Sequence, residues 1–590
     1  MKKIFNFQKI KKFDPRNILL INIVVFGLVF VLNSMIRFEN QVLSCSFWLL
    51  CEDQTISQYQ TIFNFQTFFA VLGLCAVFYQ SFQKEITKYL KARRVMYSIL
   101  VTISIFLVTN SLFAFLPSQI RILMQILFSL MVSLMLTFIY VETNDNLNDH
   151  HQKNRLHEKI RLLTISSLLM VALGVITSIA QSSLVCDQFP LCFSQHGFRV
   201  ENLLINMHRI LTLFTGLVLV SALDQTWRKY REKLSLMIPI TVGFSIFIGQ
   251  SLVGAVQIFR NLDLNLLFIH SISSFVYLLS LIFVYRKSAF IQESDNEYKL
   301  TFFNDSLRRK DYLILNKPII VALLLVTTFA GMVVGGEKIP SFSLTFWTMV
   351  GGALAAGGAS AINQFIDRKI DLSMQRTAKR PLPAGRLYPA EALALGVAEI
   401  IFSFYIFTAF VNLNAALLAM IGMVYYVIIY SKWLKHATVQ NIVIGGGAGA
   451  IPPLVGWAAA TGGLNVPSIF LFALVFLWTP PHFWALALIR KNDYARANIP
   501  MMPVIRGEEK TRFQILIYTI QLVLLTLLMP LFGVGGGVYF VLAVVLGLWL
   551  LSTAWQVYRN GGNKIAFKMY RYSSMYLAFI FLALVVDVLV

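Results

Sequence analysis

About seventeen apolar segments of roughly 20 residues recur along this chain, and they constrain its fold more than any other feature. A helix of that length is what crossing the hydrocarbon core of a bilayer requires. The predicted spans are 18–36, 62–82, 95–116, 120–141, 162–181, 203–223, 234–257, 264–285, 318–336, 341–362, 389–410, 413–430, 441–460, 467–489, 514–534, 537–556 and 570–589. Only 13% of the 590 residues are charged, against about a quarter in soluble proteins. The sequence predicts an all-α, polytopic membrane protein with about 17 transmembrane helices.

The net charge of +22 raises nucleic-acid binding as an alternative. The basic residues, however, gather in alternate short loops between the spans instead of on one solvated surface. Positively charged loops of this kind mark the cytoplasmic side of a membrane protein. The basic leader MKKIFNFQKIKKFDPR precedes a full-length span and so predicts an uncleaved anchor. We therefore expect a multi-pass protein of the cell inner membrane, with a cytoplasmic N-terminus and no nucleic-acid partner.

The longest polar break after the eighth span covers residues 286–318. Eight predicted spans precede it and nine follow. This break predicts a membrane module at 1–290, a cytoplasmic linker at 291–317 and a second membrane module at 318–590.

The first module contains a Cys-x5-Cys pattern twice, as Cys45 with Cys51 and as Cys186 with Cys192. Both pairs fall in loops predicted on the extracytoplasmic side, where disulfides persist. Two short-loop disulfides are expected, and free thiols at chance spacing are the alternative. The repeat also indicates a duplicated unit, which predicts two four-helix bundles.

Two histidines of the first module, His208 and His270, lie within the sixth and eighth predicted spans. Neutral imidazoles on separate helices of one bundle are suited to axial ligation of a heme iron. A hydrogen bond to a neighbouring helix is the structural alternative. This half of the chain resembles the heme A synthases, which implies that His208 and His270 hold a heme b cofactor.

The same resemblance implies a further histidine pair and a glutamate in the first bundle. The corresponding stretch, QTIFNFQTFFAVLGL at 60–74, contains neither residue type. The departure argues against oxidation of a heme methyl group, and heme A synthase activity stays open. A heme-binding module that hands heme on is the other interpretation.

In the second module, Asn363, Asp367 and Asp371 recur every four residues at the end of an apolar segment. That spacing predicts a ladder of oxygen ligands along one helix face. Mg²⁺ prefers one or two carboxylates together with substrate phosphates, and it can neutralise a departing diphosphate. The bases Arg376, Lys379 and Arg380 would supply further countercharge for such an anion. Ordinary cytoplasmic loop charge is the alternative, but it does not account for the spaced acids.

A second motif follows the fourteenth span, in FLWTPPHFWALALIRKNDYARANIPMMP. Asp493 falls on the same predicted membrane side as the ladder and could complete a diphosphate site. We expect the adjacent prolines Pro480 and Pro481 to break the helix where its backbone lines a cavity. His482 would orient heme or a water molecule, with a structural hydrogen bond as the alternative.

These motifs resemble the UbiA prenyltransferase superfamily and, within it, the heme O synthases (protoheme IX farnesyltransferases). The resemblance covers about residues 310–590. It implies transfer of a farnesyl group from farnesyl diphosphate to a vinyl group of heme b, with Mg²⁺ as cofactor. It implies lipid and these two substrates as partners, with heme-copper oxidase assembly factors as a further candidate. A bifunctional enzyme that also makes heme A, a non-catalytic first module and a quinone-precursor prenyltransferase are the alternatives.

Overall fold

The computed structural model describes residues 154–179, 188–192, 200–260, 264–291 and 306–590, with a few isolated positions before residue 140. Every regular element among them is helical. The chain divides into two compact units, Met1–Tyr298 and Lys299–Val590. Thirteen helices in the described ranges are long and apolar enough to span a membrane. They correspond to the fifth to seventeenth predicted spans. The first four predicted spans and the stretch 60–74 lie largely or wholly outside the described residues.

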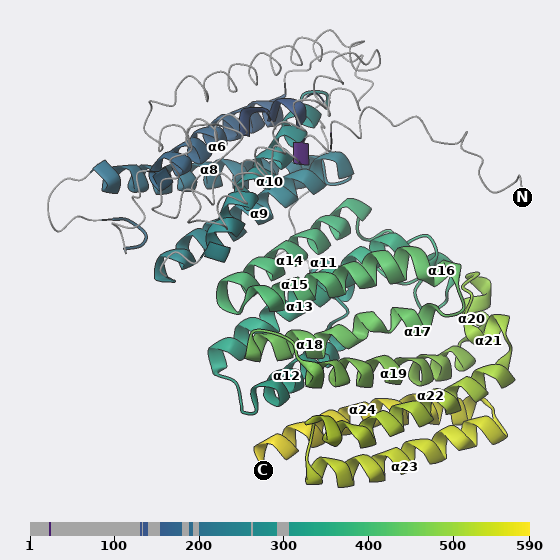
Figure 1. Ribbon diagram of the computed structural model, residues 1–590. Coiled ribbons are helices and arrows are strands. Elements are labelled where there is room, and N and C mark those ends of the chain that lie inside the picture. Colours follow the sequence, from purple (N-terminus) through teal and green to yellow (C-terminus); the bar gives the residue numbers. More distant parts are fainter. Residues whose placement is uncertain are drawn as a thin grey trace, which may run out of the picture. The chain divides into compact units, whose positions relative to one another are not determined.

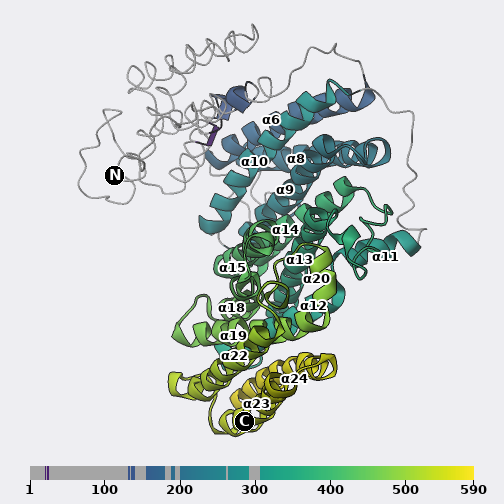
Figure 2. The same ribbon diagram turned by 90° about the vertical axis from the view of Figure 1, so that its right-hand side faces the viewer.

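The described part of the first unit is a bundle of four helices, α6 (Arg155–Ile179), α8 (Val200–Lys229), α9 (Leu234–Phe259) and α10 (Leu264–Ser288). Each helix contacts the next, and α10 contacts α6, so the four close into a ring. Figure 2 shows them running nearly along one another. Tyr277 of α10 is fully buried in this bundle and its hydroxyl lies 2.8 Å from the Ser167 hydroxyl of α6. The four-helix bundle predicted for this region is present.

The second unit contains the nine predicted spans. They are α12 (Pro318–Gly336), α13 (Phe342–Asp367), α14 (Pro389–Phe410), α15 (Leu413–Val424) continuing into η3 (Tyr425–Leu434) and α16 (Lys435–Ala437), α17 (Asn441–Gly445) continuing into α18 (Gly447–Thr461), α19 (Val466–Ile489), α22 (Glu508–Leu528) continuing into η4 (Met529–Phe532), α23 (Gly537–Asn560) and α24 (Asn563–Leu589). In Figure 1 they lie nearly parallel, with α13 to α15 at one edge and α22 to α24 at the other. Helix α12 contacts α13, α18, α19 and α24, which places it centrally.

Four short elements complete the second unit. These are α11 (Ser306–Leu315), η2 (Asp371–Ser373), α20 (Lys491–Arg496) and α21 (Met502–Ile505). All four belong to segments predicted as cytoplasmic. Helix α11 falls inside the segment 291–317, which the sequence predicts to be a linker.

Small residues allow α12 and α18 to approach closely. A methyl group added to Gly331 would overlap the carbonyl oxygen of Pro453, and one added to Gly456 would overlap that of Thr328. Backbone contact of this kind is typical of helix pairs in membranes, where packing replaces the hydrophobic effect.

The structure contradicts the predicted break at Pro480 and Pro481. Helix α19 runs without interruption through both prolines. Proline is tolerated in membrane helices where neighbouring groups compensate for the missing N–H donor. Thr479, Pro480, Pro481 and His482 are all buried against the rest of the unit. Packing of this stretch therefore accompanies the continuation of α19 through both prolines.

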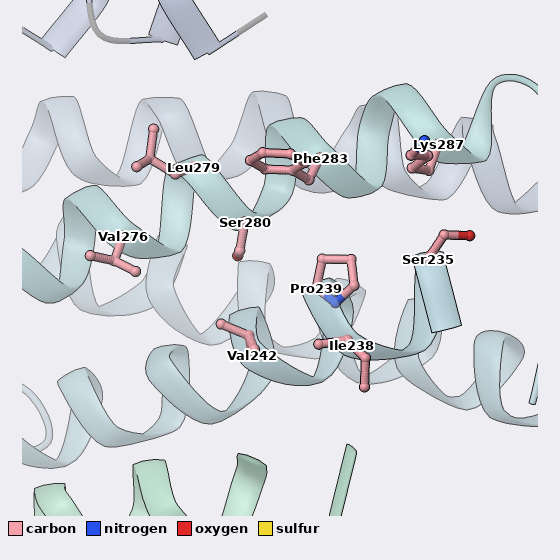
Figure 3. Close-up of a pocket in the computed structure, with 9 residues that line it drawn as sticks. All are labelled: Ser235, Ile238, Pro239, Val242, Val276, Leu279, Ser280, Phe283 and Lys287. Carbon is pink, nitrogen blue, oxygen red and sulfur yellow. The ribbon is translucent and has the colours of Figure 1, made fainter. Parts of the chain in front are cut away.

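An apolar groove of about 470 Å³ lies between α9 and α10 in the first unit. Pro239 and Phe283 line it, with Lys287 at one end (Figure 3). None of the residues predicted as ligands or catalytic groups lines this groove.

Candidate functional site

The end of α13 carries two residues of the predicted ladder. Asn363 and Asp367 are buried there, at 4% and 2% exposure. The helix ends at Asp367, and Asp371 lies on η2, where it is also buried. The prediction of one continuous helical ladder is wrong at this step. Tighter i→i+3 bonds follow Asp367, with the Ile370 amide donating to the Asp367 carbonyl at 2.9 Å.

Asn363 and Asp367 form the centre of a polar network. The Asn363 amide donates from Nδ2 to Asp367 Oδ2 and to the Ser431 hydroxyl, both at 2.9 Å. Asp367 Oδ2 also accepts from Lys435 Nζ at 2.7 Å. Asp367 Oδ1 is buried and has no hydrogen-bond partner among the described residues. One oxygen of this carboxylate is thus held in place while the other is left for a ligand.

Asp371 is fixed by the segment 374–388 that follows η2, which we call the basic loop. Arg380 Nη1 donates to Asp371 Oδ2 at 2.7 Å. The Thr377 hydroxyl donates to the Asp371 carbonyl at 3.0 Å. The other two predicted bases, Arg376 and Lys379, are exposed. Of the three predicted anion-binding bases, Arg380 is therefore the one paired with the acidic residues.

Lys435 reaches Asp367 because the preceding segment is a π-helix, η3. Such i→i+5 turns are rare and occur frequently at functional sites. Here the Ser431 hydroxyl donates to the Tyr426 carbonyl five residues earlier, at 2.8 Å. Ser431 contacts Asn363, and Lys435 contacts Asp367. The wide turn brings these side chains to the same end of α13, which hydrophobic periodicity did not predict.

Lys317 is a site residue that the sequence reasoning missed. It directly precedes α12 in the left-handed conformation, with φ 47°, which is uncommon for a residue other than glycine. Its Nζ donates to Asn363 Oδ1 at 3.1 Å and to the Tyr426 hydroxyl at 3.4 Å. Burial lowers the pKa of Lys317 to about 7, and nearby Arg380 lowers it as well. In the sequence, a single lysine before a proline indicates only the start of a helix, so nothing there pointed to Lys317 as a site residue.

The second predicted motif approaches the first at Tyr494. Asp493 lies on α20, is 7% exposed and forms an ion pair with Arg496. Burial raises the pKa of the neighbouring Tyr494 hydroxyl, while Arg376 opposes that shift and Asp493 adds to it. Met374 of the first motif belongs to the same hydrophobic cluster against which Ile370 and Tyr494 pack, so the two motifs share one packed region.

His482 is placed differently from the aspartates. Its Nδ1 lies 2.9 Å from the Ser573 hydroxyl of α24. Its ring stacks on Trp478 and on Tyr570, with centroids 4.3 and 4.6 Å away. These contacts favour the structural alternative for His482 over contact with a substrate.

The donor set around Asp367 fits a divalent cation that also binds substrate. The described residues contain no cluster of three or more histidine, cysteine or acidic side chains that would hold a metal by themselves. Two carboxylates and one amide oxygen, with Asp367 Oδ1 unpartnered, match the sparse protein ligation that Mg²⁺ shows when phosphates supply the remaining ligands.

Comparison with known proteins assigns the second half of the chain. A model of the UbiA prenyltransferase family matches residues 324–582. A protoheme IX farnesyltransferase from Symbiobacterium thermophilum is 50% identical over 281 residues, which are 47% of this chain and 94% of that protein. The chain belongs to the UbiA prenyltransferase family. All nine spans of the second unit overlap or adjoin the matched segment.

Longer UbiA relatives align over the same length. A protoheme IX farnesyltransferase from Roseiflexus sp. is 50% identical over 278 residues, or 47% of this chain and 52% of the relative. One from Chloroflexus aurantiacus is 48% identical over 280 residues, or 48% of each. The chain spans about half the length of these curated relatives.

Two solved structures are also similar to the chain. One, of a digeranylgeranylglyceryl phosphate synthase, has a TM-score of 0.42 at 18% identity and covers 47% of this chain and 98% of that one. The other, a UbiA homolog from Archaeoglobus fulgidus bound to DMAPP and Mg²⁺, has a TM-score of 0.37 at 17% identity and covers 46% and 99%.

A second candidate site lies in the first unit, ahead of the UbiA match. His208 lies on α8 and His270 on α10, two helices of the same bundle. His208 Nδ1 lies 3.1 Å from the Met170 carbonyl of α6, and His270 Nδ1 lies 3.0 Å from the Gln250 carbonyl of α9. A ring that donates from Nδ1 presents Nε2 as the nitrogen that can ligate a metal.

Both histidines also pack on a glycine four residues after the carbonyl that they contact. A Cβ at Gly174 would lie 2.9 Å from His208 Cε1, and one at Gly254 would lie 3.2 Å from His270 Cε1. The two imidazoles are therefore held in the same way by separate helices. Two equivalent, oriented imidazoles in one bundle fit the ligand set of a bis-histidine heme.

The cysteine prediction is only partly within the described residues. Cys192 is disulfide-bonded. Its predicted partner Cys186, and the other predicted pair, Cys45 and Cys51, lie outside the described residues. Both pairings stay predictions.

Proposed function

We propose that this chain transfers a farnesyl group from farnesyl diphosphate to a vinyl group of heme b and so makes heme O. The observation that carries the proposal is the 50% identity to a protoheme IX farnesyltransferase of which the chain covers 94%. The buried acidic and basic network at the end of α13 supports it, because its chemistry suits a diphosphate.

In the proposed reaction, the C1–O bond of farnesyl diphosphate breaks and its electron pair leaves with the diphosphate. The vinyl π electrons form the new carbon–carbon bond, and water adds the hydroxyl group and gives up a proton. Asn363, Asp367 and Asp371 would hold Mg²⁺, which supplies Lewis-acid neutralisation of the diphosphate when bound.

The bases of this chain have a separate part in the proposal. Lys317, Lys435 and Arg380 bind and orient the diphosphate oxygens, and Arg376 and Lys379 add countercharge at the exposed edge of the site. Asp493 closes the site from the side of α20. Since the Lys/Arg-rich loops contain this network, we place it on the cytoplasmic face of the cell inner membrane.

For the first unit we propose heme b binding through His208 and His270. The matching Nδ1 contacts and glycine cradles support it. The unit would hold or hand on heme, and heme-copper oxidase assembly factors are its expected partners. His208→Ala should remove a bis-histidine absorption spectrum from the purified protein. A spectrum unchanged in that variant would contradict the assignment.

The experiment that tests the main proposal is expression in a host lacking heme O synthase, with extracted hemes separated by chromatography. Heme O supports farnesyl transfer. Heme A in addition would favour the bifunctional alternative. A prenylated aromatic acid without heme O would contradict the choice of heme as acceptor.

A further inference from the structure

The segment just before the first UbiA span is packed structure and not a linker. Helix α11 buries Leu315 fully, in a cluster with Ala361 of α13 and Leu382 of the basic loop. The carbonyl of Leu315 accepts from the Ser360 hydroxyl at 2.7 Å and from Gln364 Nε2 at 2.8 Å. The turn after α11 then leads directly to the site residue Lys317.

One ion pair joins α11 to the basic loop. Arg386 donates from Nε and Nη2 to the two carboxylate oxygens of Asp311, at distances from 2.9 to 3.1 Å. The Asp311 side chain is 10% exposed and that of Arg386 is 43% exposed. Arg386 Nη2 also donates to the Lys379 carbonyl at 3.2 Å. The Arg386 guanidinium therefore contacts both Asp311 of α11 and the backbone of Lys379, seven residues earlier in the basic loop.

A second set of contacts joins α11 to the start of α14, where the same loop ends. Arg308 Nη2 donates to Glu391 Oε1 at 2.5 Å, and the Tyr312 hydroxyl donates to the same oxygen at 2.9 Å. Glu391 is fully buried and its Oε2 accepts from the Tyr388 amide at 2.9 Å. Helix α11 thus contacts the basic loop at Arg386 and the start of α14 at Glu391. Helix α11 contacts α13, and Figure 2 shows it at the edge of the second unit.

Few other side-chain contacts of the described residues hold the basic side chains of this loop in place. Arg380 is fixed by Asp371, but Arg376 and Lys379 are exposed, and Gly385 takes a left-handed turn with φ 71°. We propose that α11 is a positioning element for this basic loop, and that Asp311 acts through Arg386 to hold Lys379 and Arg380 in place for the diphosphate. The inference rests on the proposed function.

Release of this contact has a specific kinetic consequence. A loop that samples more conformations must be ordered when the diphosphate binds, and that ordering weakens binding. The chemical step occurs after ordering and is unaffected. The KM for farnesyl diphosphate should therefore rise while kcat stays within about twofold of wild type, because the ordering cost weakens the substrate complex and the transition state equally.

The test compares Asp311→Asn, Arg386→Gln and the double variant in membranes supplied with heme b and varied farnesyl diphosphate. We expect each single variant to raise KM about tenfold, the loss of one charge-assisted contact, and the double variant to match the singles. The swapped pair Asp311→Arg with Arg386→Asp should return KM towards wild type. Asp224→Asn is the control, since Asp224 pairs with Arg228 within one helix of the first unit and joins no separate segments.

Hydrogen exchange of residues 374–388 gives a readout that does not depend on activity. Asp311→Asn should speed exchange in that segment and leave α19 unchanged. Additive effects in the double variant, a loss confined to kcat, or unchanged exchange would each overturn the proposal. Absence of heme O from the wild-type chain would refute the proposed function instead, and the exchange data would still decide whether α11 holds the loop.

Discussion

The two candidate sites bury their ligands in opposite ways. Each of His208 and His270 has Nδ1 close to a backbone carbonyl and packs on a glycine, all within a four-helix bundle. The aspartates of the second unit are surrounded by bases from separate segments, namely Lys317, Arg380 and Lys435. A neutral imidazole needs a single hydrogen bond to be buried without large cost, whereas a buried carboxylate needs charged partners. The kind of supporting contact, backbone carbonyl or charged side chain, follows the charge of the ligand.

This contrast has a consequence for mutational sensitivity. In the acidic site, a change in one residue alters the charge balance of its neighbours, so effects should be large and coupled. In the histidine site, a backbone carbonyl and a closely packed glycine contact each ring, so small side-chain changes at the glycines should produce local and graded effects. The three predictions below test this difference.

The largest effect is expected for Asp367→Ala. It removes the carboxylate whose Oδ1 is unpartnered and leaves Lys435 Nζ without its acceptor. Heme O production should fall by at least about 100-fold, the scale of losing one group that stabilises developing charge. Heme chromatography of membranes from the complemented host measures it.

A matched variant separates catalysis from charge balance. Asp367→Asn keeps the volume of the side chain and should also be inactive, while yield and thermal unfolding stay near wild type. If Asp367→Asn combined with Lys435→Met regained full activity, the aspartate would serve only to neutralise the lysine, and the metal assignment would be wrong.

The sequence was sufficient to predict the thirteen long apolar helices among the described residues, and it singled out the acidic residues of the candidate site. Spans can be read from hydropathy because lipid requires that backbone groups bond within the helix. Asn363, Asp367 and Asp371 stood out because no topology rule explains acids spaced by four residues. The same regularity misled at Asp371, where i→i+3 bonds end α13 early.

Other features depend on packing that a single sequence does not reveal. Nothing in periodicity indicates the π-helix that brings Lys435 to Asp367, or the left-handed turn that brings Lys317 to Asn363. A rule for isolated helices predicts a break at the two prolines of α19, but the helix continues through them in the packed unit. The polar residues of α11 are typical of a linker, and the partners of its Arg308, Asp311 and Tyr312 side chains are 75 or more residues away in sequence.

An intermediate effect is expected for Lys435→Met. Lys435 Nζ contacts Asp367 directly, whereas Lys432, three residues earlier on the π-helix η3, is exposed. Loss of a hydrogen bond between charged groups should reduce kcat/KM about tenfold. Lys432→Met is the control and should retain wild-type activity. Equal losses in the two variants would show that general basicity of the loop matters and that the contact with Asp367 does not.

The smallest effect, and the most direct comparison of the two sites, is expected for glycine substitutions in the first unit. A Cβ at Gly174 would lie 2.9 Å from His208 Cε1, closer than the 3.2 Å between a Cβ at Gly254 and His270. Overpacking of this kind costs about 1–3 kcal/mol, so Gly174→Ala should lower heme occupancy of the purified protein several-fold and Gly254→Ala less. Heme O production should not change. Gly216→Ala is the control. Its Cβ would lie 3.1 Å from Phe247 Cε1, and the neighbours within 4 Å include no histidine. If it lowered heme occupancy as much as Gly174→Ala, bundle packing in general would set heme binding, and the glycine cradles would have no special role.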